Sequence, residues 1–503
     1  MRRIPPTIAS QHPDNAFAPY WDKAGRPFIS AYQEIGEAVA CFQDLGVSEY
    51  MWDWEGKHAD AAAIDRLFSE HYDYFSKHRL GRDKFLTFRI PNIWKEKGYN
   101  LLQAMTVILS SEDFARDLKF RSRPLFEVIL PMTERADQVM HMQKLFQKLA
   151  RFKANDFAPD QPANTDYLEL IPLVEGVESQ LGVAELLADY VKLHKQHFGR
   201  TPSYIRAFLA CSDSSLSSGF LAGILGNKLG ICRLHAFAKQ TGIPVFPFLG
   251  AGSLRFRGGL APDTIDRFIT EFPGVRTVTV QSAFRYDHSL KEVKAAIKRL
   301  EKELPVSKPR AIDRASQNAL TAIIRHSAEL YKNTLGGLIP DMEAVFKAVP
   351  KRRDRRQHIG LLAYARSMGQ QSLPRAITFT GGFYSIGVPP EFIGFGRTLR
   401  SLKPADLQLL KREYPNLTND IEAAGRYLNA DNLRALAKRG KAWGQVAEDV
   451  HAAQAILDVE FGPRTADEKA HHKLAAAALA LRDDQAILPD LISKMAGLRK
   501  SIG

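Results

Sequence analysis

Residues 167–175 read YLELIPLVE, an apolar run that ends in a single carboxylate, Glu175. A short apolar run of this length is typical of a buried strand. A segment with helical periodicity follows it at 183–198. Six further runs of the same kind occur up to residue 281, at 49–54, 85–90, 126–131, 204–211, 245–249 and 275–281. The first part of the chain therefore repeats a unit of one strand followed by one helix.

This repeat predicts how the strands are arranged. Helical segments at 61–75, 136–152 and 219–241 separate the other apolar runs. Strands that alternate with helices pair in parallel through right-handed crossovers. A weaker run near 6–10 would be the eighth, and eight such units predict an α/β fold, a TIM-like (β/α)8 barrel. We expect residues 1–304 to form this barrel, which would be the catalytic region.

The rest of the chain is predicted to be helical. Beyond residue 305 the helical segments are 312–335, 406–414, 419–428, 432–457 and 466–481. Connections such as 335–341 (LGGLIPD) are too short and too apolar for a flexible linker. We therefore expect residues 305–503 to pack on the barrel without folding independently. The apolar, glycine-rich loop 381–396 is expected to line or cover the barrel mouth.

The composition excludes several classes of protein. Three scattered cysteines argue against a disulfide framework or a zinc site, and the apolar runs are far shorter than a membrane span. We expect a soluble, cytoplasmic protein that does not bind a membrane. The net charge is +13, but its one dense cluster, Lys351–Arg356, lacks interleaved aromatic residues. Attraction of small anions is the favoured explanation, and a basic nucleic-acid-binding protein is the alternative.

Polar side chains stand at or just beyond the end of almost every predicted strand. In a parallel barrel these positions share the C-terminal mouth, where catalytic groups gather. The residues concerned are His12, Asp53, Glu55, Arg89, Glu175, Asp213, Arg257 and Arg285.

Two of these residues, Glu175 and Asp213, are candidate metal ligands. Carboxylates on neighbouring strands suit a hard divalent cation that also takes substrate oxygens. They could instead be a general acid and base, or Asp213 could cap the helix that follows it. His12 lies in SQHPDN before a proline that restricts its backbone, so it could exchange protons or be structural.

The arginines on glycine-rich segments suggest an anion pocket. In LGAGSLRFRGGL (249–260), Arg257 could bind phosphate or carboxylate while Gly258 and Gly259 let the backbone approach it. A solvated surface turn is the alternative. Arg366, Arg375 and Arg397 repeat this pattern beyond the barrel, where they could line the same pocket or a loop-rich surface.

The chain resembles the phosphoenolpyruvate carboxylases, specifically their short, archaeal-type branch. The resemblance extends from the first residues to the last, and its motifs occur in family order. They are SQHPDN (10–15), MWDWEGK (51–57), FRIPN (88–92), IPLVEGVES (171–179), CSDSS (211–215), GSLRFRGGLAP (252–262), QSAFRYD (281–287), LPRAITF (373–379) and GLRKSIG (497–503).

The resemblance implies an activity and a set of site residues. The family makes oxaloacetate and inorganic phosphate from phosphoenolpyruvate and bicarbonate with Mg²⁺ or Mn²⁺, and we expect a homodimer or homotetramer. It implies that Glu175 and Asp213 hold the metal. His12 would be the catalytic histidine, and Arg257 would bind the phosphate and also be catalytic. Arg375 and Arg366 would be further substrate ligands, Arg375 being catalytic as well, and Arg89 is a looser match.

The chain departs from the long branch of the family in the glycine-rich loop. That branch has a histidine and a further arginine where this chain has Leu249 and Ala251. His12 is the candidate to do the work of that histidine. Arg255 is either an added anion contact or a surface variant. Another phosphoenolpyruvate- or pyruvate-type barrel lyase or phosphotransferase is the alternative within the enzymes.

Overall fold

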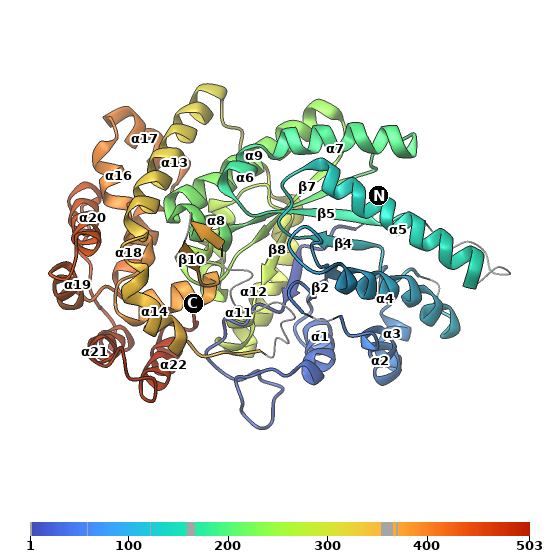
Figure 1. Cartoon of the computed structure of the whole chain (residues 1–503), viewed down its shortest axis with the longest axis horizontal. Coiled ribbons are helices and arrows are strands. Elements are labelled where there is room, and N and C mark those ends of the chain that lie inside the picture. The colour runs from blue at the N-terminus through green and yellow to red at the C-terminus, as the bar shows by residue number, and fades with distance from the viewer. Residues whose placement is uncertain (1–2, 58, 121, 158–165, 354–365, 369–370) are drawn as a thin grey trace.

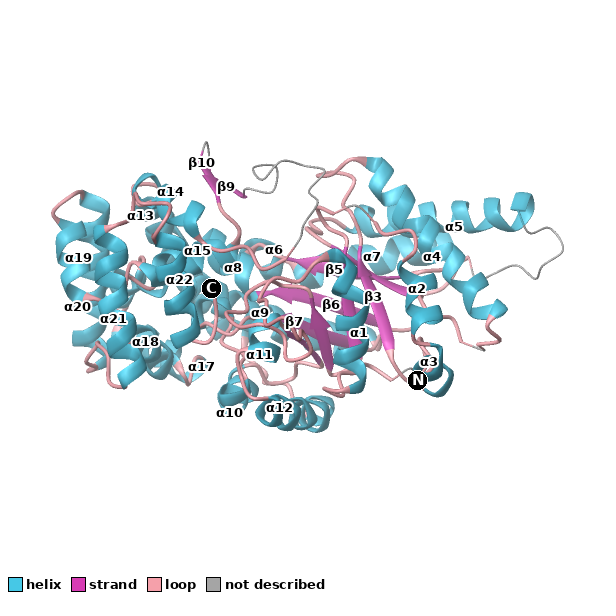
Figure 2. Ribbon diagram, turned by 90° about the horizontal axis from the view of Figure 1, so that it is seen from below, coloured by secondary structure: helices cyan, strands magenta, loops and turns pink. Residues whose placement is uncertain are grey.

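A closed barrel of eight parallel strands lies at the centre of the computed structural model (Figures 1 and 2). The structure describes residues 3–57, 59–120, 122–157, 166–353, 366–368 and 371–503. The strands are β1 (Thr7–Ser10), β2 (Glu49–Asp53), β3 (Phe85–Arg89), β4 (Glu127–Leu130), β5 (Glu169–Val174), β6 (Ile205–Ala210), β7 (Val245–Gly250) and β8 (Thr277–Val280). They follow chain order, and β1 pairs with β8 to close the ring. The prediction of a (β/α)8 barrel is confirmed, including its weakest strand.

Helices surround the barrel between its strands. They are α1 (Glu34–Gln43), α2 (Ala63–Glu70), α3 (Tyr72–Lys77), α4 (Gly98–Asp117), α5 (Ala136–Phe157), α6 (Val177–Leu181), α7 (Val183–Phe198), α8 (Cys211–Ser218), α9 (Phe220–Thr241), α10 (Ile265–Glu271), α11 (Ser282–Tyr286) and α12 (Leu290–Glu303). The single helix predicted at 61–75 is two helices, because His71 leaves the helical conformation with φ −131°.

A second, helical region lies against one side of the barrel (Figures 1 and 2). Its helices are α13 (Arg314–Leu335), α14 (Ile339–Ala348), α15 (Ala376–Ser385), α16 (Phe395–Ser401), α17 (Pro404–Glu413), α18 (Leu417–Gly425), α19 (Ala430–Ala437), α20 (Lys441–Leu457), α21 (Ala466–Ala480) and α22 (Leu488–Leu498). The short strands β9 (Arg366–Met368) and β10 (Gln371–Leu373) pair antiparallel. The helix predicted at 432–457 is interrupted because Gly440 is extended, with φ −173°.

One hydrophobic core continues from the barrel into the helical region. The Phe256 ring, in the loop after β7, lies 5.6 Å from the Phe379 ring of α15. This shared core supports the prediction that residues 305–503 do not fold alone.

The segment 381–396 is not the single loop that was expected, and that it lines or covers the barrel mouth stays a prediction. Every residue of this segment is buried, and its first part belongs to α15. A Cβ atom at Gly381 would lie 2.6 Å from the Ile502 carbonyl oxygen, so the glycine permits close packing rather than movement.

The N-terminal end of the barrel is closed by a buried ion cluster, here named the floor cluster, which consists of Glu49, Glu127 and Arg206. Arg206 donates to Glu49 and to Glu127, each over 2.7 Å, and all three side chains are at most 2% exposed. Apolar side chains such as Met51 and Phe248 fill the barrel above the cluster. The floor of the barrel is therefore a packed structural layer.

In the described part of the chain, no helix is both long and apolar enough to cross a membrane.

Candidate active site

Three charged residues at the ends of β2 and β3 form a second ion cluster, here named the mouth cluster: Asp53, Glu55 and Arg89. The strand register places Asp53 directly beside Arg89. Arg89 Nε donates to Asp53 Oδ1 over 2.8 Å, and its Nη1 lies 2.9 Å from Glu55 Oε2. The sequence predicted Arg89 as a substrate ligand, and in this structure the guanidinium already holds two carboxylates.

The surroundings shift the pKa values of the two acids of the mouth cluster in opposite directions. Although burial acts in the opposite direction, the Arg89 guanidinium lowers the pKa of the Asp53 carboxyl to about 2. Burial raises the pKa of Glu55 above its usual value, against the attraction of Arg89. Asp53 is thus a fixed negative charge, whereas Glu55 is closer to taking up a proton.

His12 lies beside the mouth cluster, just after β1. Burial lowers the pKa of its imidazole well below the usual value, and the positive charges of Arg89, Arg257 and Arg375 act in the same direction. These arginines come from β3, from the loop after β7 and from the start of α15, so segments far apart in sequence meet around one histidine. The Ser10 hydroxyl oxygen lies 2.9 Å from Nδ1. When Nδ1 donates to Ser10, Nε2 of the neutral ring is left as an acceptor.

Arg257 is almost completely buried, and its guanidinium faces acceptors of the protein. It donates to Asp14 over 2.9 Å and to Ser212 over 3.1 Å, and also to Gln281 and to the Gly503 carbonyl oxygen. Four of its five N–H groups are used in this way. A substrate phosphate at Arg257 would therefore replace at least some of these acceptors.

Gly258 and Gly259 shape the turn that carries Arg257. Their φ values are +105° and +69°, and a Cβ atom at Gly258 would lie 2.8 Å from that of Ala251. Both backbone amides donate within the turn, to the Arg255 and Leu254 carbonyls, over 3.0 Å each. In this conformation both amides are used within the turn, and the glycines are required by backbone geometry. That the backbone approaches a bound phosphate here stays a prediction.

Glu175 follows β5 directly, and Asp213 lies in the first turn of α8. Asp213 acts electrostatically on Glu55, and Glu175 acts on Arg89, so both acids lie near the mouth cluster. The capping alternative for Asp213 is wrong, because Ala210 is the residue that precedes α8. Among the described residues, no group of three or more His, Cys, Asp or Glu side chains could hold a metal. Two carboxylates still fit Mg²⁺ or Mn²⁺, since these ions complete their coordination with water and substrate oxygens.

Comparison with known proteins identifies the family. A family model described as phosphoenolpyruvate carboxylase matches residues 4–503. The chain belongs to the phosphoenolpyruvate carboxylase family. Its relatives include proteins of that name from Leuconostoc mesenteroides, 55% identical over 100% of this chain and 99% of the relative, and from Oenococcus oeni, 50% identical with the same coverage. A relative of that name from Metallosphaera sedula is 35% identical over the full length of both chains, which supports the short, archaeal-type branch.

The remaining arginines predicted from the carboxylase motifs are placed as follows. Arg375 precedes α15, is partly exposed and acts on both His12 and Glu55, so it reaches the mouth from the helical region. The backbone of Arg366 pairs with Leu373 in the hairpin of β9 and β10, and its side chain lies outside the described structure.

Other arginines singled out in the sequence are structural. Arg397 pairs with Asp449 over 2.8 Å, and Arg285 donates to Glu37 over 2.7 Å. Arg255 lies 3.2 Å from Asp420 of α18, with a side chain 18% exposed. Arg255 is therefore not a solvated surface variant, because it links the loop after β7 to the helical region. That it also contacts a substrate anion stays a prediction.

The basic cluster at 351–356 also has a structural part. Arg352 donates to the Asn15 carbonyl over 3.1 Å, and Arg353 is buried against two glutamates. Residues 354–356 lie outside the described structure. The basic cluster was the main argument for nucleic-acid binding, and two of its arginines already bind groups within the protein.

Two residues near the site were not predicted from the sequence, Gln11 and Asp14. Gln11 is fully buried and accepts the backbone N–H of Asp53 over 3.0 Å. Asp14 accepts Arg257 and also the backbone N–H of Ala283 over 2.8 Å. Both lie inside the SQHPDN motif, whose position next to His12 is the signal that could have indicated them.

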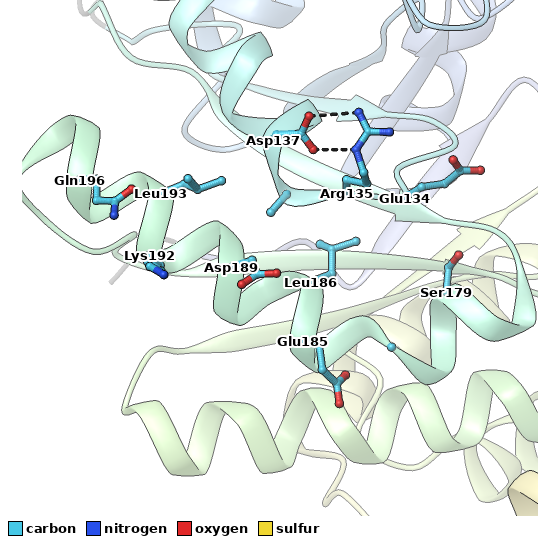
Figure 3. A pocket seen from close by; sticks show the side chains of 12 residues that line it. Glu134, Arg135, Asp137, Ser179, Glu185, Leu186, Asp189, Lys192, Leu193 and Gln196 are labelled. Carbon is cyan, nitrogen blue, oxygen red and sulfur yellow. Dashed lines mark hydrogen bonds and ion pairs between the residues drawn. The ribbon is translucent and has the colours of Figure 1, made fainter.

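A cavity of about 590 Å³ lies between the start of α5 and helix α7, and the residues that line it include no member of the mouth cluster (Figure 3). Its charged lining residues are Glu134, Arg135, Asp137, Glu185, Asp189 and Lys192. Four carboxylates against two cations make it a poor site for a phosphorylated acid.

Proposed function

We propose that this protein converts phosphoenolpyruvate and bicarbonate into oxaloacetate and inorganic phosphate, with Mg²⁺ or Mn²⁺. The observation that carries the proposal is the meeting of His12 with Arg89, Arg257 and Arg375 at one barrel mouth, in a member of the carboxylase family. This arrangement suits a substrate that bears both a phosphate and a carboxylate.

The chain's own residues would divide the binding work between them. Arg257 and Arg375 would neutralise the phosphoryl oxygens, since guanidinium groups bind such oxygens through paired hydrogen bonds. Glu175 and Asp213 would hold the divalent ion, which when bound withdraws charge from the phosphate and enolate oxygens. Asp53 would keep Arg89 fixed beside the substrate.

The proposed reaction has two bond-making stages. A bicarbonate oxygen attacks phosphorus and the bond from phosphorus to the enol oxygen breaks, which gives carboxyphosphate and the enolate of pyruvate. Carboxyphosphate then loses its hydroxyl proton and splits into CO₂ and phosphate. The enolate carbon attacks CO₂ to form oxaloacetate.

His12 is the group that would handle the proton. Because its pKa is lowered, the imidazole is neutral near pH 7, and Nε2 can accept the proton of carboxyphosphate and return it to phosphate. The largely buried surroundings also limit water, which matters because protonation of the enolate carbon yields only pyruvate.

Coupling the reaction to malate dehydrogenase tests the proposal. Oxaloacetate should form from phosphoenolpyruvate when both bicarbonate and Mg²⁺ are present and should disappear when bicarbonate is removed. Pyruvate or phosphate formed at the same rate without bicarbonate would instead indicate another lyase or phosphotransferase of this barrel type. Binding to DNA that weakens steeply with salt, without turnover, would favour the nucleic-acid alternative.

A further inference from the structure

Six buried residues next to the site form a closed ring of hydrogen bonds, here named the buried ring. All six residues are between 0 and 6% exposed. The members are Gln11, Glu34, Glu37, Tyr50, Lys57 and Arg353.

Ion pairs close one half of the ring. Arg353 Nη1 donates to Glu34 Oε1 over 3.2 Å, and Arg353 Nη2 donates to Glu37 over 2.8 Å. Lys57 Nζ donates to the same Glu34 oxygen over 2.6 Å. One guanidinium therefore bridges two carboxylates of α1.

The uncharged side chains of Gln11 and Tyr50 close the other half of the ring, between Lys57 and Glu37. Lys57 Nζ donates to Gln11 Oε1 over 3.2 Å, and Gln11 Nε2 donates to the Tyr50 hydroxyl over 3.1 Å. The Tyr50 hydroxyl donates to Glu37 Oε2 over 2.9 Å. The path then returns to Arg353 through Glu37.

Stability of the fold alone does not explain the ring, because burying charged groups costs desolvation free energy. Burial opposes ionisation of Glu37, yet Arg353 and Arg285 hold the pKa of this carboxyl below its usual value. Well-packed apolar residues often replace such buried ion pairs without loss of stability. A closed polar network does, however, hold its members in one defined arrangement, and here Arg353 Nε is a buried nitrogen of the ring without a hydrogen-bond partner among the described residues.

The ring touches the proposed site at two points. Gln11 directly precedes His12, and its Oε1 also accepts the Asp53 backbone N–H over 3.0 Å. Lys57 lies two residues after Glu55. The ring thus fixes the segment carrying His12 against the segment carrying two members of the mouth cluster.

Arg353 is the ring member that comes from the helical region. Its backbone bridges to Ile29, and it extends its side chain to α1 beside the barrel. We propose that Arg353 is a positioning residue that, through Gln11, keeps His12 in place to receive the proton of carboxyphosphate. This inference rests on the proposed carboxylase reaction.

The test measures oxaloacetate, pyruvate and phosphate together in Arg353→Met. A displaced His12 slows carboxylation, and the enolate is then protonated to pyruvate, which amounts to hydrolysis of phosphoenolpyruvate. We expect the ratio of pyruvate to oxaloacetate to rise roughly tenfold to hundredfold, since small misplacements of a reacting group have effects of this size. Lys351→Met removes the same charge from an exposed neighbour and should leave the ratio unchanged.

Two further variants keep the test decisive if Arg353→Met folds poorly. Tyr50→Phe removes only the hydroxyl between Gln11 and Glu37, and should raise the pyruvate share about two- to tenfold. Arg353→Lys keeps the positive charge, but a single ammonium group cannot pair with both glutamates as the guanidinium does. The ratio of pyruvate to oxaloacetate in this variant should therefore stay above the wild-type ratio.

The outcomes separate this inference from the function on which it rests. If all products fall together and their ratio stays constant in both Arg353→Met and Tyr50→Phe, the ring is only structural and the inference is wrong. If wild-type enzyme makes no oxaloacetate, the proposed function itself is wrong. If His12→Asn raises the pyruvate share while both ring variants do not, only the positioning role is overturned.

Discussion

The two ends of the barrel carry ion clusters of the same composition, one arginine with two carboxylates. Strand β2 contributes to both, through Glu49 in the floor cluster and Asp53 in the mouth cluster. The floor cluster is at most 2% exposed, whereas in the mouth cluster Arg89 and Glu55 are 8% and 10% exposed and lie near His12 and Arg375. Residue type alone does not separate these clusters. Two features of position distinguish the structural cluster from the candidate active site. One is the end of the strand at which the cluster lies, and the other is which chain segments meet at that end.

The largest expected effect concerns the floor cluster. Arg206→Leu leaves Glu49 and Glu127 buried without their cation, which should lower the free energy of unfolding by about 3–5 kcal/mol. Denaturant unfolding measures this loss. The rate per folded molecule should stay near the wild-type rate, and a rate loss as large as that of a mouth variant would remove the distinction between the two ends.

The next effect concerns the proposed metal ligands at the mouth. Asp213→Asn keeps the shape of the side chain and removes its charge, so turnover should fall by roughly 10²–10³ while the unfolding midpoint changes little. Mn²⁺ binding, followed by electron paramagnetic resonance, should weaken as well. Asp137→Asn, an exposed change of the same kind, is the control, and unchanged Mn²⁺ affinity in Asp213→Asn would sink the assignment.

The pH dependence of stability should show the charge of Asp53. Its pKa is lowered in the folded protein, so its contribution of about 2 kcal/mol is present above pH 5 and is lost as the pH falls through 4 toward 2. Unfolding curves of wild type and Asp53→Asn at pH 7 and pH 3 measure this difference. The gap between them should shrink at pH 3, and a gap that does not change would mean that Asp53 is not held ionised by Arg89.

The smallest effect is expected at Arg255. Arg267 also pairs with Asp420, so Arg255→Met leaves that carboxylate with a partner and should cost about 1 kcal/mol of stability. Turnover should change little at low and at high salt. A large loss of turnover that salt reduces would instead restore Arg255 as a steering charge for the substrate.

Local patterns in the sequence predicted the barrel and the strand-end polar residues. Apolar runs of strand length are short-range signals, so even the weak strand β1 could be placed. The partners of Arg257 could not be predicted, because Asp14, Ser212, Gln281 and Gly503 approach it only in the folded chain. For the same reason the sequence could not show that Arg255 and Arg353 form internal ion pairs. Helix α15 was missed because its glycines, which permit close packing, look like loop signals.

The role of His12 at the mouth is tested most directly by its replacement with asparagine. Oxaloacetate, pyruvate and phosphate should be measured together in His12→Asn, with circular dichroism to confirm folding. We expect slow release of phosphate accompanied by pyruvate and little oxaloacetate, because the phosphoryl transfer remains possible and the later proton step does not. A full yield of oxaloacetate from His12→Asn would contradict a catalytic role for this histidine at the barrel mouth.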